Sequence, residues 1–136
     1  MTGLEIILEP SHLEALKATK EFDRGYIFVK KESGLLVAQG VHEVSRGPQL
    51  IVPSELDIIG RVLREGYACV PYINSSEDNP QHGSAFALFS AENVLNLEKF
   101  VAYGIINVEP RFYHLVGDGV TFVKPVPFRL PVAHRM

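Results

Sequence analysis

The segment LIVPSELDIIGRVLREGYACVPYI, residues 50–73, constrains the fold of this chain more than any other. Its apolar residues up to Leu63 recur at the spacing of one helix face, with charged residues off that face. Ser54 is suited to cap the start of this helix, and Gly66 is suited to end it in a left-handed conformation. Residues 67–73 then form an apolar run typical of a strand, in which Pro71 favours an edge or a bulge.

The segment before it predicts a small piece of its own. Ser11 and Glu14 have the spacing of a helix capping box. Residues 32–34 separate two strand-like runs, which favours a hairpin. The predicted elements are a strand at residues 4–8, a helix at about 12–22, and strands at 26–31 and 34–44.

The segment after it adds strands and one more helix. Gly117-Asp118-Gly119 lies between two runs of apolar and aromatic residues, which indicates a hairpin. The predicted elements are a strand at residues 84–90, a helix at 91–104, and a hairpin over 110–126, before a proline-rich tail. The fold class expected is α/β (mixed α+β), with a βαββ piece at residues 1–48 and an αβ domain at 49–136 that ends in a β-hairpin.

Length and composition exclude several classes of protein. A chain of 136 residues with 46% hydrophobic residues can bury a core without disulfides, and its single cysteine, Cys69, forms no intrachain disulfide. Cys69 lies in an apolar run, which favours a buried thiol. No signal-peptide pattern and no apolar run of about 18 residues is present, so we expect a cytoplasmic protein that does not contact membranes. No phosphate loop, paired-cysteine site or nucleophile elbow is present either, so we expect no cofactor and no dedicated metal site.

Charge is distributed unevenly along the chain. The net charge is −3, but residues 99–136 hold five basic and two acidic side chains, a balance of +3. Such a basic region can contact an anionic partner. We expect Arg111, Lys124 and Arg129 in this region to contact RNA if the protein binds it.

The polar run that contains His82 is the strongest candidate for chemistry. Its ten or so residues, 75–84, form a longer connection between strands than a usual hairpin loop. Glu77, Asp78 and His82 lie within it, and such side chains can bind a metal ion. From these residues alone, a solvated loop and a small metal-dependent hydrolase that uses Asp78 and His82 both remain open.

The order of elements from residue 58 onward resembles the C-terminal domain of tRNA-splicing endonucleases. The matching segments cover about 75 residues, and they are VLREGYACV, HGSAFALFS, NLEKFVAYGIINVEPRFYHLV and GDGVTFVKPVPF. In that family a tyrosine acts as general base, a histidine as general acid, and a lysine stabilises charge on the phosphate. Each role has a physical need: a proton acceptor, a donor that titrates near neutrality, and a fixed cation.

Of these three residues, the resemblance carries over only the histidine, as His82. Tyr72 is out of place for the family's tyrosine motif. Where the lysine is expected the chain reads Glu109-Pro110-Arg111, and a carboxylate there repels the charge of the transition state. The resemblance therefore implies a non-catalytic, structural subunit, which pairs with a homologous catalytic subunit and acts on precursor tRNA.

The resemblance also implies how such subunits join. The hairpin turn and the strand after it are the expected interface, with Asp118, Val120, Phe122 and Val123 as its residues. An exposed strand edge of this kind has unpaired backbone N–H and C=O groups that can pair with a strand of another chain. A hetero-oligomer and a homo-oligomer both satisfy this expectation, and a self-associating module without RNA function is the alternative.

Overall fold

The computed structural model describes residues 4–45, 57, 60–61, 64–76, 79, 102–116 and 122–131. These residues include one helix that is described from start to end, α1 (Pro10–Lys17), and eight strands. The strands are β1 (Glu5–Ile7), β2 (Arg24–Glu32), β3 (Leu35–Ser45), β4 (Ala68–Asn74), β5 (Tyr103–Ile106), β6 (Pro110–Val116), β7 (Phe122–Val126) and β8 (Phe128–Arg129). The expected mixture of helix and strand is confirmed, with strands dominant in this part of the chain.

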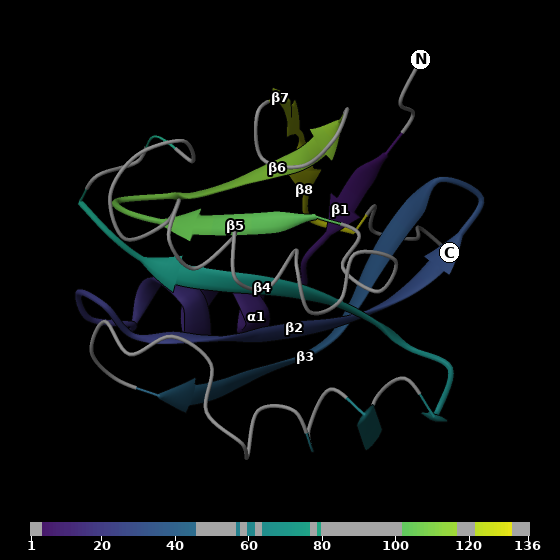
Figure 1. Cartoon of the computed structure of the whole chain (residues 1–136), viewed down its shortest axis with the longest axis horizontal. Helices are drawn as coiled ribbons and strands as arrows, with labels where there is room; N and C mark the ends of the chain where they lie inside the picture. Colours follow the sequence, from purple (N-terminus) through teal and green to yellow (C-terminus); the bar gives the residue numbers. More distant parts are fainter. Residues whose placement is uncertain are drawn as a thin grey trace, which may run out of the picture.

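The eight strands form one sheet that curls almost into a closed barrel (Figure 1). Their order is β7-β6-β5-β4-β2-β3-β1-β8, so β7 and β8 are the two edges although only Pro127 separates them in sequence. α1 contacts both β3 and β6, which three strands separate within the sheet. The sheet therefore curls around one side of α1.

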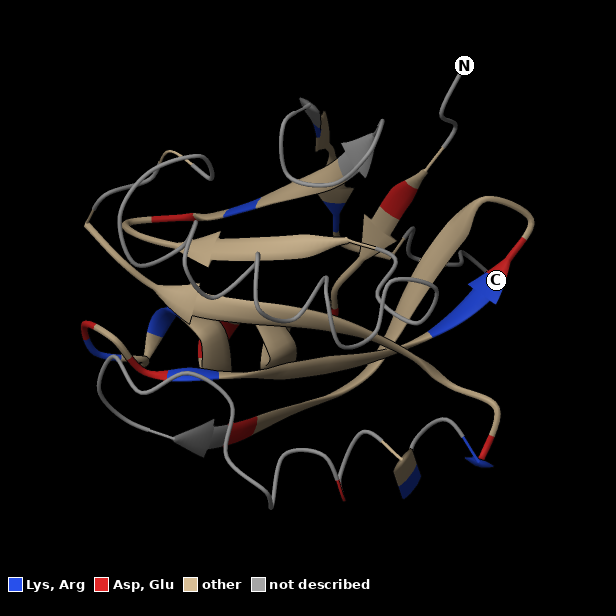
Figure 2. Cartoon of the chain, viewed as in Figure 1, with Lys and Arg blue, Asp and Glu red and all other residues tan. Residues whose placement is uncertain are grey.

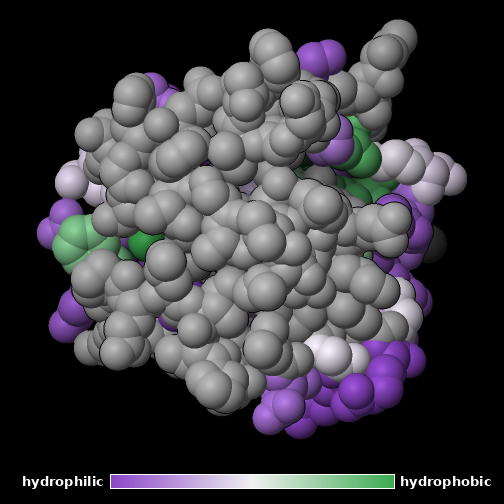
Figure 3. All heavy atoms as spheres, viewed as in Figure 1, coloured by the Kyte–Doolittle hydropathy of each residue, from purple (hydrophilic) through white to green (hydrophobic). Residues whose placement is uncertain are grey.

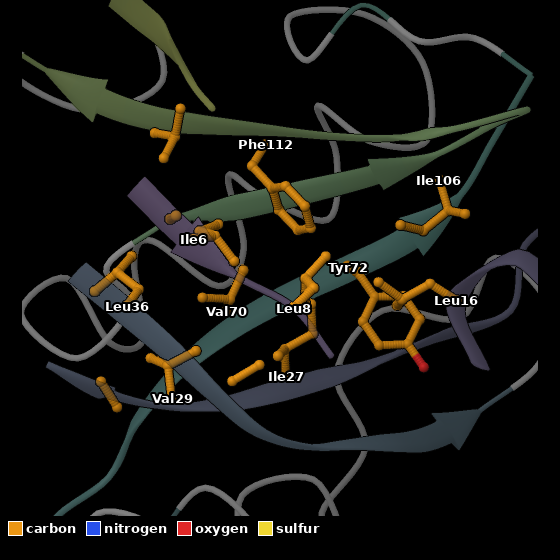
Figure 4. Close-up of a cluster of buried hydrophobic side chains, with 14 residues drawn as sticks. Ile6, Leu8, Leu16, Ile27, Val29, Leu36, Val70, Tyr72, Ile106 and Phe112 are labelled. Carbon is orange, nitrogen blue, oxygen red and sulfur yellow. The ribbon is translucent and has the colours of Figure 1, made fainter. Parts of the chain in front are cut away.

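Strands from both predicted pieces belong to this sheet. β2 pairs antiparallel with β4, and β1 pairs parallel with β8. The predicted boundary between residues 48 and 49 lies outside the described residues. The strands on its two sides share one hydrophobic core, which includes Ile6, Leu36, Val70 and Ile106 (Figure 4).

One row of paired residues crosses the sheet on the face that lines this core, here called the inner face. From β6 to β2 the row runs Phe112, Gly104, Tyr72 and Gly25, so each aromatic residue has a glycine beside it. A Cβ on Gly104 would lie 2.8 Å from the Phe112 ring, and one on Gly25 would lie 2.6 Å from the Tyr72 hydroxyl oxygen. The two glycines thus leave the space that the rings occupy, and they help the sheet to bend.

Two predicted turns are confirmed by their backbone angles. Ser33 and Gly34 join β2 to β3, with φ of 50° and 84°. Positive φ at both central residues is the twist that suits a two-residue hairpin. Gly66, with φ of 89°, follows helical residues at 57, 60, 61 and 64, as expected for a helix stop. Ser54 and the predicted elements at 84–90 and 91–101 lie outside the described residues.

The predicted start and end of the first helix were wrong. α1 begins after Glu9, whose N–H donates to Nδ1 of His12 at 3.2 Å, and not after Ser11. Pro10 explains the shift, because a proline fits the first turn of a helix, where its missing N–H is not needed. The helix ends at Lys17, and the N–H of Ala18 bonds back to the carbonyl of Glu14.

Further corrections concern the later strands. β4 is a central strand and not an edge, because β2 and β5 pair with its two sides. Pro71 is tolerated there because it pairs with β2 only, and the pairing with β5 begins at Tyr72. No helix extends to Gly104, as was predicted, because residues 103–106 form β5. The proline-rich tail contributes β8, which was not predicted. The thiol of Cys69 is buried, as expected.

The described surface carries few large apolar side chains. Only Val108 and Leu130 are large hydrophobic residues with exposed side chains in the described ranges. On the face drawn in Figure 3, the coloured atoms at the periphery are mostly hydrophilic, with small hydrophobic areas between them. No helix among the described residues is long and apolar enough to span a membrane.

Candidate interaction site

The expected interface residues lie on and next to β7. Phe122 and Val123 belong to β7, while Asp118 and Val120 lie outside the described residues. β7 pairs antiparallel with β6 from Phe122 to Val126, which confirms the predicted hairpin strands. Within the described part of the chain, β7 has no strand on its other side.

The direction of the backbone groups of β7 follows from Pro125. A proline has no N–H, and within a sheet it is tolerated where its nitrogen points away from the neighbouring strand. Alternate residues of an antiparallel strand direct their N–H and C=O groups to the same side. We therefore expect the N–H and C=O of Val123, two residues before Pro125, to point away from β6 and to be able to pair with a further strand.

A pocket of about 440 Å³ opens next to the end of β7. It lies at the seam of the nearly closed sheet, where the chain leaves β7 and crosses through Pro127 to β8. The rings of Phe112 and Phe128 meet edge to face there, with centroids 5.8 Å apart. Sequence reasoning missed this pocket, because it exists only where two distant strands approach each other.

The three cations expected to contact RNA do not share one face. Phe112 is on the inner face, so its neighbour Arg111 is on the outer face of β6. Lys124 pairs with His114, two residues after Phe112, and therefore lies on the inner-face side of β7, where it is exposed. Figure 2 shows Lys and Arg residues spread over separate elements, without a single basic patch among the described residues.

Arg129, the third cation, forms an ion pair that links β8 to β1. Its Nε lies 2.8 Å from Oε2 of Glu5, and the two side chains are 40% and 30% exposed. The backbone N–H of Leu8 also donates to the Arg129 carbonyl at 3.0 Å. The guanidinium of Arg129 is thus engaged in closing the sheet.

The loop predicted to carry His82 begins at a well-defined anchor. Asn74, the last residue of β4, donates from Nδ2 to the carbonyl and to Oγ1 of Thr19, at 3.1 and 2.8 Å. Its backbone pairs with Phe22 and Asp23, and Ser76 donates to Glu21 at 3.1 Å. Sequence reasoning missed this contact between the α1–β2 turn and the loop. His82, Glu77 and Asp78 themselves lie outside the described residues.

Tyr72 is unsuited to act as a general base. Its side chain is buried on the inner face, and its hydroxyl has no hydrogen-bond partner in the described part of the chain. Burial raises the pKa of Tyr72 well above its ordinary value, and the charges of Glu43 and Asp23 raise that pKa further. A hydroxyl that holds its proton so tightly does not accept one at neutral pH.

The segment where the resemblance leads us to expect a lysine also lacks a suitable group. Glu109 is exposed in the turn before β6, Pro110 is buried, and Arg111 is exposed on the outer face. Over the described ranges, no group of three or more His, Cys, Asp or Glu side chains could hold a metal ion. The described residues therefore assemble neither set of reactive groups.

No family model matches the chain, and no curated protein matches it either. The resemblance to tRNA-splicing endonucleases stays a prediction from the segments quoted above. Among the described residues, the unpaired side of β7 and the pocket next to its end are the features best suited to bind a partner.

Proposed function

We propose that this protein is a non-catalytic, structural subunit of a cytoplasmic tRNA-splicing endonuclease that removes introns from precursor tRNA. It pairs through β7 with a homologous catalytic subunit. Its C-terminal part supplies an endonuclease-like αβ domain that ends in the β6–β7 hairpin.

The single observation that carries the proposal is that β7 has a strand on only one side among the described residues. Among the described strands β7 has β6 as its one neighbour, and it contains Phe122 and Val123 of the expected interface. Main-chain groups that point away from the sheet can pair with a strand of another chain, and such pairing supplies affinity without a dedicated pocket. The hairpin that the family resemblance implies as an interface thus contains a strand, β7, that is at the edge of the sheet formed by the described strands.

The non-catalytic part of the proposal is supported by Tyr72 and Glu109. Tyr72 keeps its proton. The resemblance aligns Glu109, a carboxylate, with the cation of the family. We expect the isolated chain to leave an intron-containing tRNA intact when the cleavage products are followed by gel electrophoresis. Efficient cleavage by the isolated chain would contradict this assignment.

The partner test uses two substitutions at one position of β7. Val123→Pro removes the N–H that points away from β6 and leaves the β6–β7 pairing in place. Val123→Thr keeps the N–H and the strand preference, so it is the matched control. Each tagged variant is purified from the native host, and the co-purifying chains are identified and quantified by mass spectrometry.

We expect the wild type and Val123→Thr to recover a stoichiometric chain that carries the catalytic Tyr/His/Lys set. Val123→Pro should recover about tenfold less of it, because backbone hydrogen bonds across the new strand pair are lost. Circular dichroism checks that Val123→Pro remains folded. Recovery of the wild type with copies of itself alone would favour the self-associating module, and equal recovery by both variants would show that β7 is not the interface.

A further inference from the structure

The pocket beside β8 forms because β7 does not pair with the first two residues of β6. β6 begins at Pro110, but its pairing with β7 begins only at Phe112, which is opposite Val126. The chain then turns away through Pro127 and joins β1 as β8. Pro110 and Arg111 are therefore not covered by β7, and the pocket lies between them and Phe128.

Its walls are held in place before any ligand binds. Three of the lining residues are prolines, whose rings restrict the backbone: Pro110, Pro125 and Pro127. The Phe112 ring is buried over Gly104 and contacts Phe128 edge to face. A pocket with rigid walls loses little conformational entropy when it binds a ligand.

The chemistry of the lining selects a class of ligand. Tyr113 and Phe128 are partly exposed and contribute aromatic rings, which pack well against a flat ring, while the buried Phe112 ring supports Phe128 from behind. The one charged side chain that lines the pocket is Arg111, and no carboxylate lines it among the described residues. A guanidinium has five N–H donors, so it can bind a carboxylate in bidentate fashion in addition to a contact with the protein.

We propose that this pocket binds a small planar aromatic molecule that carries a carboxylate. The flat ring lies against the aromatic and proline walls, and the carboxylate binds Arg111. The volume of about 440 Å³ is within the range of pockets for small molecules. This site is separate from the strand-pairing function proposed for β7, because it depends on the residues at the seam and not on the N–H of Val123.

The test uses two probes with the same naphthalene ring, the anionic 2-naphthoate and the neutral 2-naphthalenemethanol. Each is titrated into the ¹⁵N-labelled full chain, and amide chemical shifts are followed by NMR. Arg111→Gln removes the cation at the pocket. Lys124→Gln removes an exposed cation that does not line the pocket, and it is the matched control.

We expect saturable shifts at residues 110–113 and 125–128 with 2-naphthoate, at sub-millimolar concentration. Arg111→Gln should weaken binding of 2-naphthoate about tenfold and leave binding of the neutral alcohol unchanged, while Lys124→Gln should alter neither. The proposal fails if the wild type shows no saturable binding up to about 5 mM. It fails equally if the shifts cluster elsewhere, or if both substitutions weaken 2-naphthoate to the same extent.

Discussion

Gly25 lies where the backbones of neighbouring strands approach closely. A Cβ there would lie 2.2 Å from the carbonyl oxygen of His42 and 2.9 Å from Cα of Glu43, both backbone atoms of β3. Backbone atoms cannot move aside as the end of a flexible side chain can. The Tyr72 ring extends across the same space, so β2, β3 and β4 all depend on the missing side chain.

Gly25→Ala should therefore destabilise the protein by about 3 kcal/mol, because the added methyl group forces neighbouring strands apart. Gly40→Ala is the control, since a Cβ at Gly40 has no atom within 4 Å, and its effect should stay within about 1 kcal/mol. Urea unfolding of both variants measures the two free energies. Equal losses of stability would show that the close approach at Gly25 does not exist.

The raised pKa of Tyr72 predicts how the stability of the protein changes with pH. Because its pKa is raised in the folded protein, the folded state holds the proton more tightly than the unfolded state, whose pKa is about 10. The resulting stabilisation is fully present below pH 10 and is lost as pH rises further. The stability of the wild type should therefore fall relative to that of Tyr72→Phe above about pH 10.

Near pH 7, Tyr72→Phe should cost less than about 1 kcal/mol, since the lost hydroxyl is buried without a hydrogen-bond partner in the described part of the chain. Thermal unfolding from pH 7 to 11 measures both effects, and Tyr67→Phe at a half-buried position controls for removal of a hydroxyl. If the difference in stability between the wild type and Tyr72→Phe does not change with pH, the pKa of Tyr72 is not raised in the folded protein.

Between elements, the turn from α1 to β2 is held by the end of β4. Phe22 has a φ of 70°, an unfavourable conformation for a bulky residue, and its N–H donates to the Asn74 carbonyl at 2.7 Å. The Asn74 side chain adds its two bonds to Thr19, 55 residues away in sequence. One asparagine thus orients the turn and the start of the polar loop together.

Asn74→Ala should destabilise the protein by about 1–2 kcal/mol, because the Thr19 carbonyl and hydroxyl lose a partly buried donor. It should also speed hydrogen exchange of the Phe22 amide. Asn107→Ala, at an exposed turn position, should change neither quantity. Chemical denaturation measures the stability, and hydrogen exchange followed by NMR measures the protection of the Phe22 amide. Similar effects from both variants would show that the Asn74 side chain does not hold the turn.

Across the whole molecule, the two ends of the chain close the sheet together. The N–H of Ile6 donates to the Pro127 carbonyl at 2.9 Å, and Phe128 pairs with Ile6. Strands from before residue 48 lie between β4 and β8, so neither predicted piece has a sheet of its own in the described residues. The loss of one piece exposes the core of the other.

The chain should therefore unfold in a single transition. Amide signals of Ile6 and Ile106, from the two predicted pieces, should disappear at the same urea concentration, because both residues belong to one core. NMR spectra recorded along a urea titration measure the two midpoints. Separate midpoints would instead support independent domains at residues 1–48 and 49–136.

Local chemistry explains what could be predicted from the chain alone. The hairpin at Ser33-Gly34, the stop at Gly66 and the paired strands of β6 and β7 each depend on residues close in sequence. Their backbone preferences act whatever the rest of the chain does. That the β6–β7 hairpin is an interface, in contrast, was implied by the family resemblance and not by local preference.

Tertiary structure decided the features that join distant residues. The pairing of β8 with β1, the central place of Pro71 and the partnership of Arg129 with Glu5 all bring together residues far apart in sequence. The pocket at Phe112 and Phe128 depends on them too, because it forms where the chain leaves β6 to pair with β1 as β8. No local preference specifies such partners, because they are selected by burial and by sheet register over the whole chain. The sequence by itself therefore determined the strands of β6 and β7 and the turns at Ser33-Gly34 and Gly66. Only the tertiary structure decided which strands lie at the edges of the sheet among the described residues, because burial and register over the whole chain select the pairing.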